Sequence, residues 1–324
     1  MIVWLPVFGA CAGMPPDDTS TETGPGPDPV DADVDGADAS VDCDDADATV
    51  NPASELRVAA GRFLRGRDDG TDAAPEREIT MSAFCLDTFE VTNAAFVDFL
   101  AGRAAAGLTN VDDEGRVLYD FEDDDDDVPA RILDDGGGAY AVLGGYEDHP
   151  VTEVYHWSAL AYCASRGKTL PTEAQWEAAA RGSENRTWPW GEEPPACVLG
   201  NLHPGPEGVG PDGEAVEPCV DDTTRVGSYP DHPGPYGHLD LAGNVAEWAL
   251  DWYQFDYYAT SPDTDPAGPD TGWSESFPDG AGEARVTRGG SFASNELSLG
   301  TSSRYVERST GTSNGVGFRC ARPW

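Results

Sequence analysis

Glycine and proline interrupt this chain throughout its length. Its 324 residues include 38 glycines and 26 prolines. Both residues favour turns and destabilise the interior of a helix, so such frequent interruption disfavours long regular elements. The sequence therefore predicts a turn-rich fold with many loops rather than a bundle of helices.

Acidic residues greatly outnumber basic ones. Aspartate and glutamate total 60, lysine and arginine total 19, and the formal net charge is −41. A field of this sign repels phosphate backbones and anionic lipid headgroups, so we expect no nucleic-acid partner. The acidity fits a protein outside the cell, a protein that binds divalent cations or a protein adapted to salt, and composition alone does not choose among these.

Residues 1–11, MIVWLPVFGAC, are apolar and end in small residues before Cys11. This pattern is typical of the end of a lipoprotein signal peptide, in which the cysteine is acylated. The basic residues that open such a signal are missing, so a wrongly chosen or truncated start is the alternative interpretation. We expect an extracytoplasmic protein, which is either a cell-envelope lipoprotein that meets the membrane only through lipid on Cys11, or a secreted protein.

Residues 12–56 contain no lysine or arginine and are rich in aspartate, proline, threonine, glycine and alanine. Such a segment has too few apolar side chains to form a core, so it is predicted to be a disordered acidic tether. Four aspartates and Gly36 within it have the spacing of a twelve-residue calcium loop, although a solvated run of charge is the alternative. The candidate calcium ligands are Asp31, Asp33, Asp35 and Asp42.

A change to mixed apolar and polar composition predicts that residues 57–324 form the folded domain. Thr92 can cap a helix whose apolar residues fall on one face. A second helix is expected at 158–166, and Thr172 with Gln175 forms a capping box that would start a third.

Strands are predicted at 84–92, at 246–253 and at 285–292 from their apolar patterning. Residues 112–145 combine a run of aspartates with a run of glycines. We expect this segment to be an acidic surface insertion that contributes little to the core.

Seven cysteines are spread along the chain, without a Cys-x-x-Cys pair of the kind found in zinc or redox motifs. Dispersed cysteines in an exported chain indicate disulfides. Cys197 and Cys219 bracket a loop, and a local disulfide there would fasten it. The sequence does not assign partners to Cys43 and Cys85.

Several phrases occur in a fixed order: VAAGRF, FCLDTFEVTN, HPVTEV, AYCASRGKTLPTEAQWEAAARG, WPWG, YGHLDLAGNVAEW, RVTRGGSF and GVGFRCAR. Together they resemble the formylglycine-generating, or sulfatase-modifying factor, family from residue 57 to residue 324. The resemblance implies a loop-rich α+β fold, like that of C-type lectins, with long loops held by calcium and disulfides. It also implies a disulfide between Cys163 and Cys320, the cysteines of the AYC and GFRC phrases.

The resemblance implies a structural calcium site at the YGHLDLAGNVAEW phrase. Matched position by position, its ligands would be Asp240, Gly243, Val245 and Glu247, and hard oxygen donors of this kind suit calcium. The alternative for Glu247 is a buried carboxylate that pairs with an arginine such as Arg319.

A second calcium site of the family would begin with Asn201 and Leu202. Its remaining ligands would fall between Cys197 and Cys219, where the sequence departs from the family pattern. This site is therefore a weaker expectation than the first.

The resemblance also implies a chemistry, the oxidation of a cysteine in a Cys-x-Pro-x-Arg segment of a sulfatase to formylglycine by copper(I), oxygen and two active-site cysteines. The matching positions, counted from Ser291, hold Ser294 and Leu299. Copper(I) prefers soft thiolates, which a hydroxyl and an aliphatic side chain cannot replace. We therefore expect no copper cofactor and no copper oxidase activity.

The favoured hypothesis is an exported, monomeric binding module for an extracytoplasmic peptide, protein or glycan. Its ligand groove would contain Ser291, Ser294, Arg304 and Arg308, where guanidinium groups could hold a carboxylate or a peptide backbone. Pairing of both arginines with nearby acids is the alternative. The competing hypotheses are an active or atypical sulfatase-modifying oxidase, another metal-dependent enzyme of the family and a structural surface protein.

Overall fold

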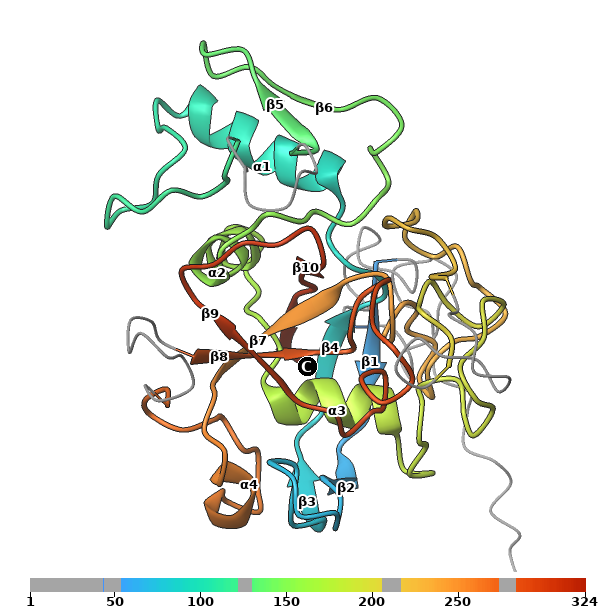
Figure 1. Ribbon diagram of the computed structural model, residues 1–324. Helices are drawn as coiled ribbons and strands as arrows, with labels where there is room; N and C mark the ends of the chain where they lie inside the picture. The colour runs from blue at the N-terminus through green and yellow to red at the C-terminus, as the bar shows by residue number, and fades with distance from the viewer. Residues whose placement is uncertain (1–42, 44–53, 122–129, 206–216, 274–283) are drawn as a thin grey trace, which may run out of the picture.

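The computed structural model describes residue 43 and residues 54–121, 130–205, 217–273 and 284–324. Its elements are short and are joined by long loops, as Figure 1 shows. The helices are α1 (Asn93–Ala105), α2 (His156–Ser165), α3 (Glu173–Arg181) and α4 (Tyr257–Thr260). The strands are β1 (Glu55–Val58), β2 (Gly61–Arg65), β3 (Arg77–Met81), β4 (Phe84–Asp87), β5 (Ile132–Asp134), β6 (Tyr140–Val142), β7 (Ala246–Trp252), β8 (Ala284–Arg288), β9 (Tyr305–Arg308), β10 (Val316–Gly317) and β11 (Ala321–Pro323).

Two small sheets form the centre of the molecule. One has the strand order β10-β7-β8-β9, and the other has the order β1-β4-β11. In Figure 1, α2 lies above and α3 below these strands, and the loops between α3 and β7 gather at the right. The pairs β2-β3 and β5-β6 are separate antiparallel hairpins. This arrangement places the first and last strands of the domain together, because β4 pairs with both β1 and β11.

The predicted helix caps are present. Thr92 Oγ1 accepts a hydrogen bond from the Ala95 amide at 3.2 Å, so it satisfies one of the free donors at the start of α1. At α3 the Thr172 hydroxyl accepts from the Gln175 amide, and the Gln175 side chain accepts from the Thr172 amide. Both helices therefore start where the capping residues predict.

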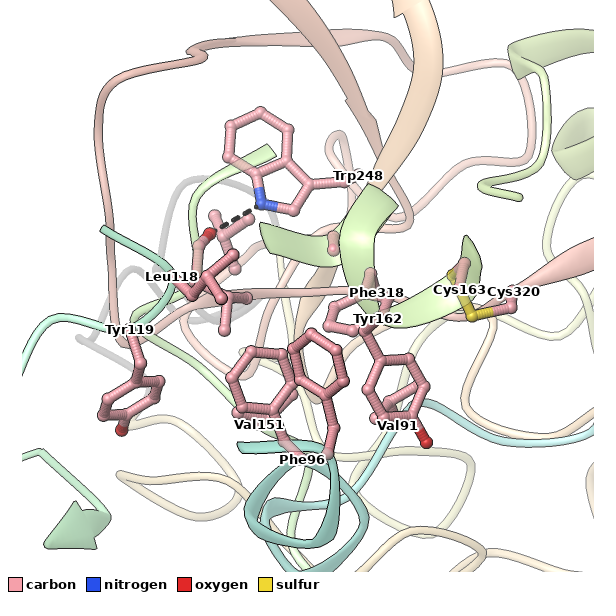
Figure 2. Packing of buried hydrophobic residues seen from close by; sticks show 14 of the residues in the cluster. Val91, Phe96, Leu118, Tyr119, Val151, Tyr162, Cys163, Trp248, Phe318 and Cys320 are labelled. Carbon is pink, nitrogen blue, oxygen red and sulfur yellow. Dashed lines mark hydrogen bonds between the residues drawn. A yellow bond between two sulfur atoms is a disulfide. The ribbon is translucent and has the colours of Figure 1, made fainter. Parts of the chain in front are cut away.

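Aromatic side chains from α1, α2 and the C-terminal strands form the main core. Phe96 stacks on Tyr162 with ring centroids 5.8 Å apart and contacts Phe318 edge to face. Figure 2 shows these rings beside the disulfide Cys163–Cys320. Full burial of each ring stabilises the fold by roughly 2 to 3 kcal/mol, so this cluster ties the helices to the last strands of the domain.

The segment 112–145 contributes more to the core than the sequence predicted. Leu118, Tyr119 and Ile132 are fully buried in the same aromatic cluster. The Ile132 amide also donates to the Tyr119 hydroxyl at 3.3 Å, which links two parts of the segment. The expectation of little core was therefore wrong for these residues, whereas the aspartate run at 123–127 lies outside the described residues.

The folded domain begins earlier than residue 57. Glu55 and Leu56 are buried in β1, although the sequence placed them in the tether. Glu55 pairs with Arg322 at 2.6 Å and with Lys168 at 2.8 Å, which compensates its buried charge. Pairing with residues far along the chain has no local sequence signal, so the boundary was placed too late.

Three disulfides close the domain. Cys163–Cys320 and Cys197–Cys219 match the predicted pairs, and the third joins Cys43 to Cys85. Disulfides of this number fit a protein that matures in an oxidising compartment. No helix in the described ranges combines the length and the apolar composition needed to cross a bilayer.

The tether itself is largely outside the described residues. The candidate lipid attachment at Cys11 therefore stays a prediction, as does the calcium loop of the tether. The residues of that loop which lie outside the described ranges are Asp31, Asp33, Asp35, Gly36 and Asp42.

Candidate functional site

The turn after β8 brings together the two positions that correspond to the family's copper-binding cysteines. Gly290 lies in this turn with a φ of 68°, a backbone conformation that favours glycine. A Cβ atom on Gly290 would lie 2.9 Å from Ser294 Cβ and 3.2 Å from Leu299 Cδ2. Both side chains therefore face the same glycine. The resemblance implies such closeness, because the family's two cysteines act together on one copper ion.

The hydroxyl group of Ser294 stands at the first of the two cysteine positions, close to the hydroxyl group of Ser291. The Ser291 amide donates to Ser294 Oγ at 2.9 Å, and the Ala293 amide donates to Ser291 Oγ at 3.3 Å. The two hydroxyl oxygens are 3.5 Å apart. These serines therefore hydrogen-bond the backbone of their own turn, which is a structural use of a short polar side chain.

Leu299 occupies the second position and faces the interior. Its exposed fraction is 0%, and it packs in a cluster with Leu202, Ala242 and Trp188. Every cysteine among the described residues is in a disulfide. No thiolate in the described part of the chain is therefore available to bind copper(I) beside Gly290.

Arg304 does not line a groove. Its side chain is fully buried, with Nε 2.6 Å from Glu173 Oε1 and NH2 2.9 Å from Glu173 Oε2. NH1 donates to the carbonyls of Asp72 and Gln254. The expected ligand-binding role for Arg304 is therefore wrong, because the acid-pairing alternative uses its donors inside the protein.

Arg308 lies at the other end of the sheet from the turn. In the antiparallel register of β8 and β9, Arg308 is opposite Ala284, the first residue of β8. Ser291 follows the last residue of the same strand, and each residue of a strand advances about 3.3 Å. Arg308 is therefore separated from the turn in which Ser291 and Ser294 lie together.

A buried acidic cluster lies beside the candidate calcium site. Burial raises the pKa of Glu90 well above its ordinary value, and the nearby charges of Asp240 and Glu247 add to the increase. The pKa of Asp240 is also raised, mainly by burial. Arg319 is the basic residue that opposes these carboxylates in both cases. This excess of negative charge is the environment that a bound divalent cation would stabilise.

One carboxylate oxygen of this cluster has no hydrogen-bond partner in the described part of the chain. Glu90 Oε2 is buried and has no hydrogen-bond partner among the described residues. Asp240 Oδ2 accepts the Gly227 amide at 2.5 Å, which fixes the carboxylate. Gly243 approaches the backbone so closely that a Cβ there would lie 2.3 Å from the Asn201 carbonyl oxygen. The donors fit calcium chemistry, and the set of Asp240, Gly243, Val245 and Glu247 stays a prediction.

Glu247 already has protein partners. Arg319 donates to both of its oxygens at 2.7 and 2.8 Å, and Trp176 Nε1 donates to Oε2 at 2.9 Å. The structure thus contains the buried ion pair that was the alternative interpretation. Glu90 was missed from the sequence, because its place in the FCLDTFEVTN phrase gives no sign that it lies beside Asp240.

The second candidate calcium site has fewer free ligands. The Leu202 carbonyl accepts the Cys219 amide at 2.8 Å, and the Asn201 carbonyl accepts the Asn244 amide at 2.7 Å. Asn201 Oδ1 is buried and has no hydrogen-bond partner in the described ranges. One side-chain oxygen therefore fits a cation, while both carbonyls already accept hydrogen bonds.

These features define a loop-rich, disulfide-bonded α+β domain in which the position of a paired-cysteine metal site is filled by serine and leucine. Residues 43–324 match the sulfatase-modifying factor enzyme 1-like domain. The chain belongs to this family, which includes the formylglycine-generating enzymes, and its loop-rich α+β fold agrees with the expectation from the sequence.

The similarity to known proteins extends over most of the chain. The formylglycine-generating enzyme of Thermomonospora curvata is 33% identical over 298 residues, which cover 82% of this chain and 92% of that enzyme. The serine/threonine-protein kinase pkn1 of Chlamydia caviae is 32% identical over 269 residues, but this chain spans only 37% of its length. The solved structure of PvdO from Pseudomonas aeruginosa superposes with a TM-score of 0.58 at 21% identity, covering 83% of this chain and 94% of PvdO.

Proposed function

We propose that this protein is an exported member of the family that lacks copper oxidase activity and acts as a binding module for a peptide, protein or glycan. The observation that supports the proposal is the pair Ser294 and Leu299 facing Gly290. A hydroxyl that caps its own turn and a fully buried aliphatic side chain supply no ligand for copper(I). The domain therefore keeps the scaffold without the metal centre of the oxidase.

Export is supported by the disulfides and by the N-terminal segment. Three disulfides fit an oxidising compartment, and one of them joins Cys43, within the predicted tether, to Cys85 in the domain. The tether would hold the domain away from the cell envelope if Cys11 is acylated, or precede a free domain if the protein is secreted. Labelling of cells with a radioactive fatty acid, comparing the natural chain with Cys11→Ser, distinguishes the two forms.

Calcium is proposed as a structural cofactor at Asp240 and Glu247 with the carbonyls of Gly243 and Val245. Glu90 adds negative charge beside the same place. A divalent ion there would neutralise buried carboxylates that one arginine leaves uncompensated. Its role is to hold the loop before β7, and the proposal assigns it no chemical step.

Mass spectrometry of a treated peptide tests the loss of oxidase activity. The purified protein is incubated with copper(I), oxygen and a peptide that contains Cys-x-Pro-x-Arg, and the Thermomonospora curvata enzyme serves as the positive control. We expect the peptide cysteine to remain a thiol with this protein and to become an aldehyde with the control. An aldehyde product from this protein would refute the proposal.

The second candidate function is an atypical sulfatase-modifying oxidase or another metal-dependent enzyme. Identity of 33% across 92% of a formylglycine-generating enzyme favours it. An enzyme of this kind would need metal ligands other than cysteine beside Gly290. Repeating the peptide assay with iron(II) or manganese(II) in place of copper separates this function from the binding module.

A further inference from the structure

A cavity of about 370 Å³ is lined in part by the segment that follows Ser294. We call it the arginine cavity, because three of its lining residues are Arg67, Arg181 and Arg186. Residues 296–303 form one wall, and residues 185–188 form another. It does not include Ser291 or Ser294, so it is separate from the position of the family's cysteine pair.

The charge of this lining is opposite to that of the whole protein. Three guanidinium groups and one carboxylate, that of Glu296, line the cavity, whereas the whole chain has a formal charge of −41. The acids that pair with these arginines, Asp69, Glu76, Glu177 and Glu184, are not part of the lining. These pairs orient the guanidinium groups. A guanidinium has five N–H donors, and in Arg186 the contacts with Glu184 and the Pro189 carbonyl use only part of them.

Two buried donors on lining residues have no protein acceptor. Arg181 Nε and Trp188 Nε1 are both inaccessible to solvent and lack a hydrogen-bond partner among the described residues. A buried donor without an acceptor costs about 1 to 3 kcal/mol, so native structures normally supply an acceptor from protein, water or ligand. Two residues of the lining therefore have donors that the described part of the protein leaves unsatisfied.

Hydrogen bonds between the two walls, and one within the wall 296–303, fix the shape of the cavity. The Thr301 amide donates to the Thr187 carbonyl at 2.9 Å, and Thr301 Oγ1 donates to the Arg186 carbonyl at 2.7 Å. Ser303 Oγ donates to the Leu297 carbonyl at 3.0 Å. Because the walls are already fixed to each other, a ligand would lose little free energy in ordering them.

The structure assigns the arginine cavity as a binding site for the oxyanion group of a small ligand, a carboxylate, sulfate or phosphate. Arginine presents its donors in a planar fork that matches such groups, and the three arginines of the lining outnumber its one carboxylate, Glu296. Leu297, which is 61% exposed at the wall, offers apolar contact for the rest of the ligand. This inference goes beyond the proposed function and does not depend on the absence of copper chemistry.

Calorimetric titration of the full chain with inorganic sulfate, inorganic phosphate and acetate, at constant ionic strength, tests the inference. We expect one saturable site for at least one of these anions. The comparison among them identifies whether a tetrahedral oxyanion or a carboxylate is preferred. Absence of saturable binding by all three anions would overturn the assignment.

Substitutions locate the site. Arg186→Gln and, separately, Trp188→Phe remove one donor each, and each should weaken binding about tenfold, the effect of 1.4 kcal/mol. Arg62→Gln is the matched control, because Arg62 is exposed on β2 and pairs with Glu78 away from the cavity. Arg67→Gln replaces Arg186→Gln if the latter lowers the melting temperature. Unchanged affinity in the cavity variants, or an equal loss in Arg62→Gln, would show that the anion binds elsewhere.

Discussion

Arg304 and Arg308 show that burial decides whether an arginine pairs with an acid inside the protein or remains accessible at the surface. The two lie on one short strand region, yet Arg304 is fully buried against Glu173 and Arg308 is half-buried at the end of β9. The resemblance to the family suggested a shared groove, but it does not reveal how deeply each arginine of this chain is buried. Ser291 and Ser294 lie together because they are close in one turn, and their place in a ligand groove stays a prediction.

Loss of Arg304 should destabilise the domain strongly. Arg304→Met leaves the buried carboxylate of Glu173 without its bidentate partner, so we expect the free energy of unfolding to fall by about 3 to 5 kcal/mol. Arg62→Met, which breaks an exposed pair with Glu78, should cost less than about 1 kcal/mol. Urea denaturation of both variants measures the difference, and similar losses would contradict the buried pairing.

Asp251 should make stability depend on pH. Burial, and then the charge of Glu173, raise the pKa of Asp251 to about 7. Because this pKa is above that of the unfolded chain, the stabilising contribution of the protonated form is complete below about pH 4 and is lost as the pH rises through 7.

Asp251→Asn separates this contribution from other titrations. Asparagine remains neutral and can still accept the Glu173 amide, which lies 2.8 Å from Asp251 Oδ2. Relative to the natural protein, the variant should gain on the order of a few kcal/mol of unfolding free energy between about pH 4 and pH 8. Urea titrations across this range check the prediction, and parallel pH profiles would argue against it.

Helices were easier to predict from the sequence than strands. Thr92 and Thr172 mark helix starts through hydrogen bonds within three residues, so the signal is local. Strand pairing in this domain joins distant segments, as in the contact of β11 with β4, and has no comparable local signal. The same reason explains why Leu118 and Ile132 were not recognised as core residues.

The loop before β7 is the element that calcium should stabilise. Removal of calcium with a chelator should lower the melting temperature, because the proposed ion would bind the carboxylate cluster of the folded domain and not the unfolded chain. A calcium concentration of 100 times its dissociation constant would contribute about 2.7 kcal/mol. Thermal unfolding with and without calcium measures the effect.

Variants distinguish the loop site from the acidic tether, which could bind calcium on its own. Asp240→Asn should abolish most of the calcium-dependent gain, whereas Asp98→Asn, an exposed position on α1, should preserve it. An undiminished gain in Asp240→Asn would assign the stabilising ion to another place.

At the scale of the whole molecule, family phrases predicted the fold and the disulfide Cys163–Cys320, and the loop between Cys197 and Cys219 predicted a second disulfide. The position of the tether boundary and the pairing of Cys43 with Cys85 came from the structure. The remaining two cysteines of the domain could have been paired by elimination, since all the others except Cys11 had partners. Glu55 lies in an acidic segment, and only its distant partners Arg322 and Lys168 reveal that it belongs to the fold.

The two predicted disulfides should differ in their effect on stability. Cys163–Cys320 joins residues 157 positions apart, whereas Cys197–Cys219 joins residues 22 positions apart. In the chain-entropy description, the longer loop is worth about 5 kcal/mol and the shorter about 3 kcal/mol. Paired Cys→Ala variants, compared by chemical denaturation, should show the larger loss for Cys163 and Cys320, and the reverse order would contradict this account.

The lack of a copper(I) site is the central claim, and a competition titration of copper(I) against a coloured chelator tests it most directly. All proteins in the experiment contain Cys11→Ser, which removes the one cysteine outside the described disulfides. The natural turn should take up no stoichiometric copper(I), whereas Ser294→Cys with Leu299→Cys should bind about one ion between two thiolates facing Gly290. Binding of one copper(I) ion by the protein that retains Ser294 and Leu299 would contradict the account.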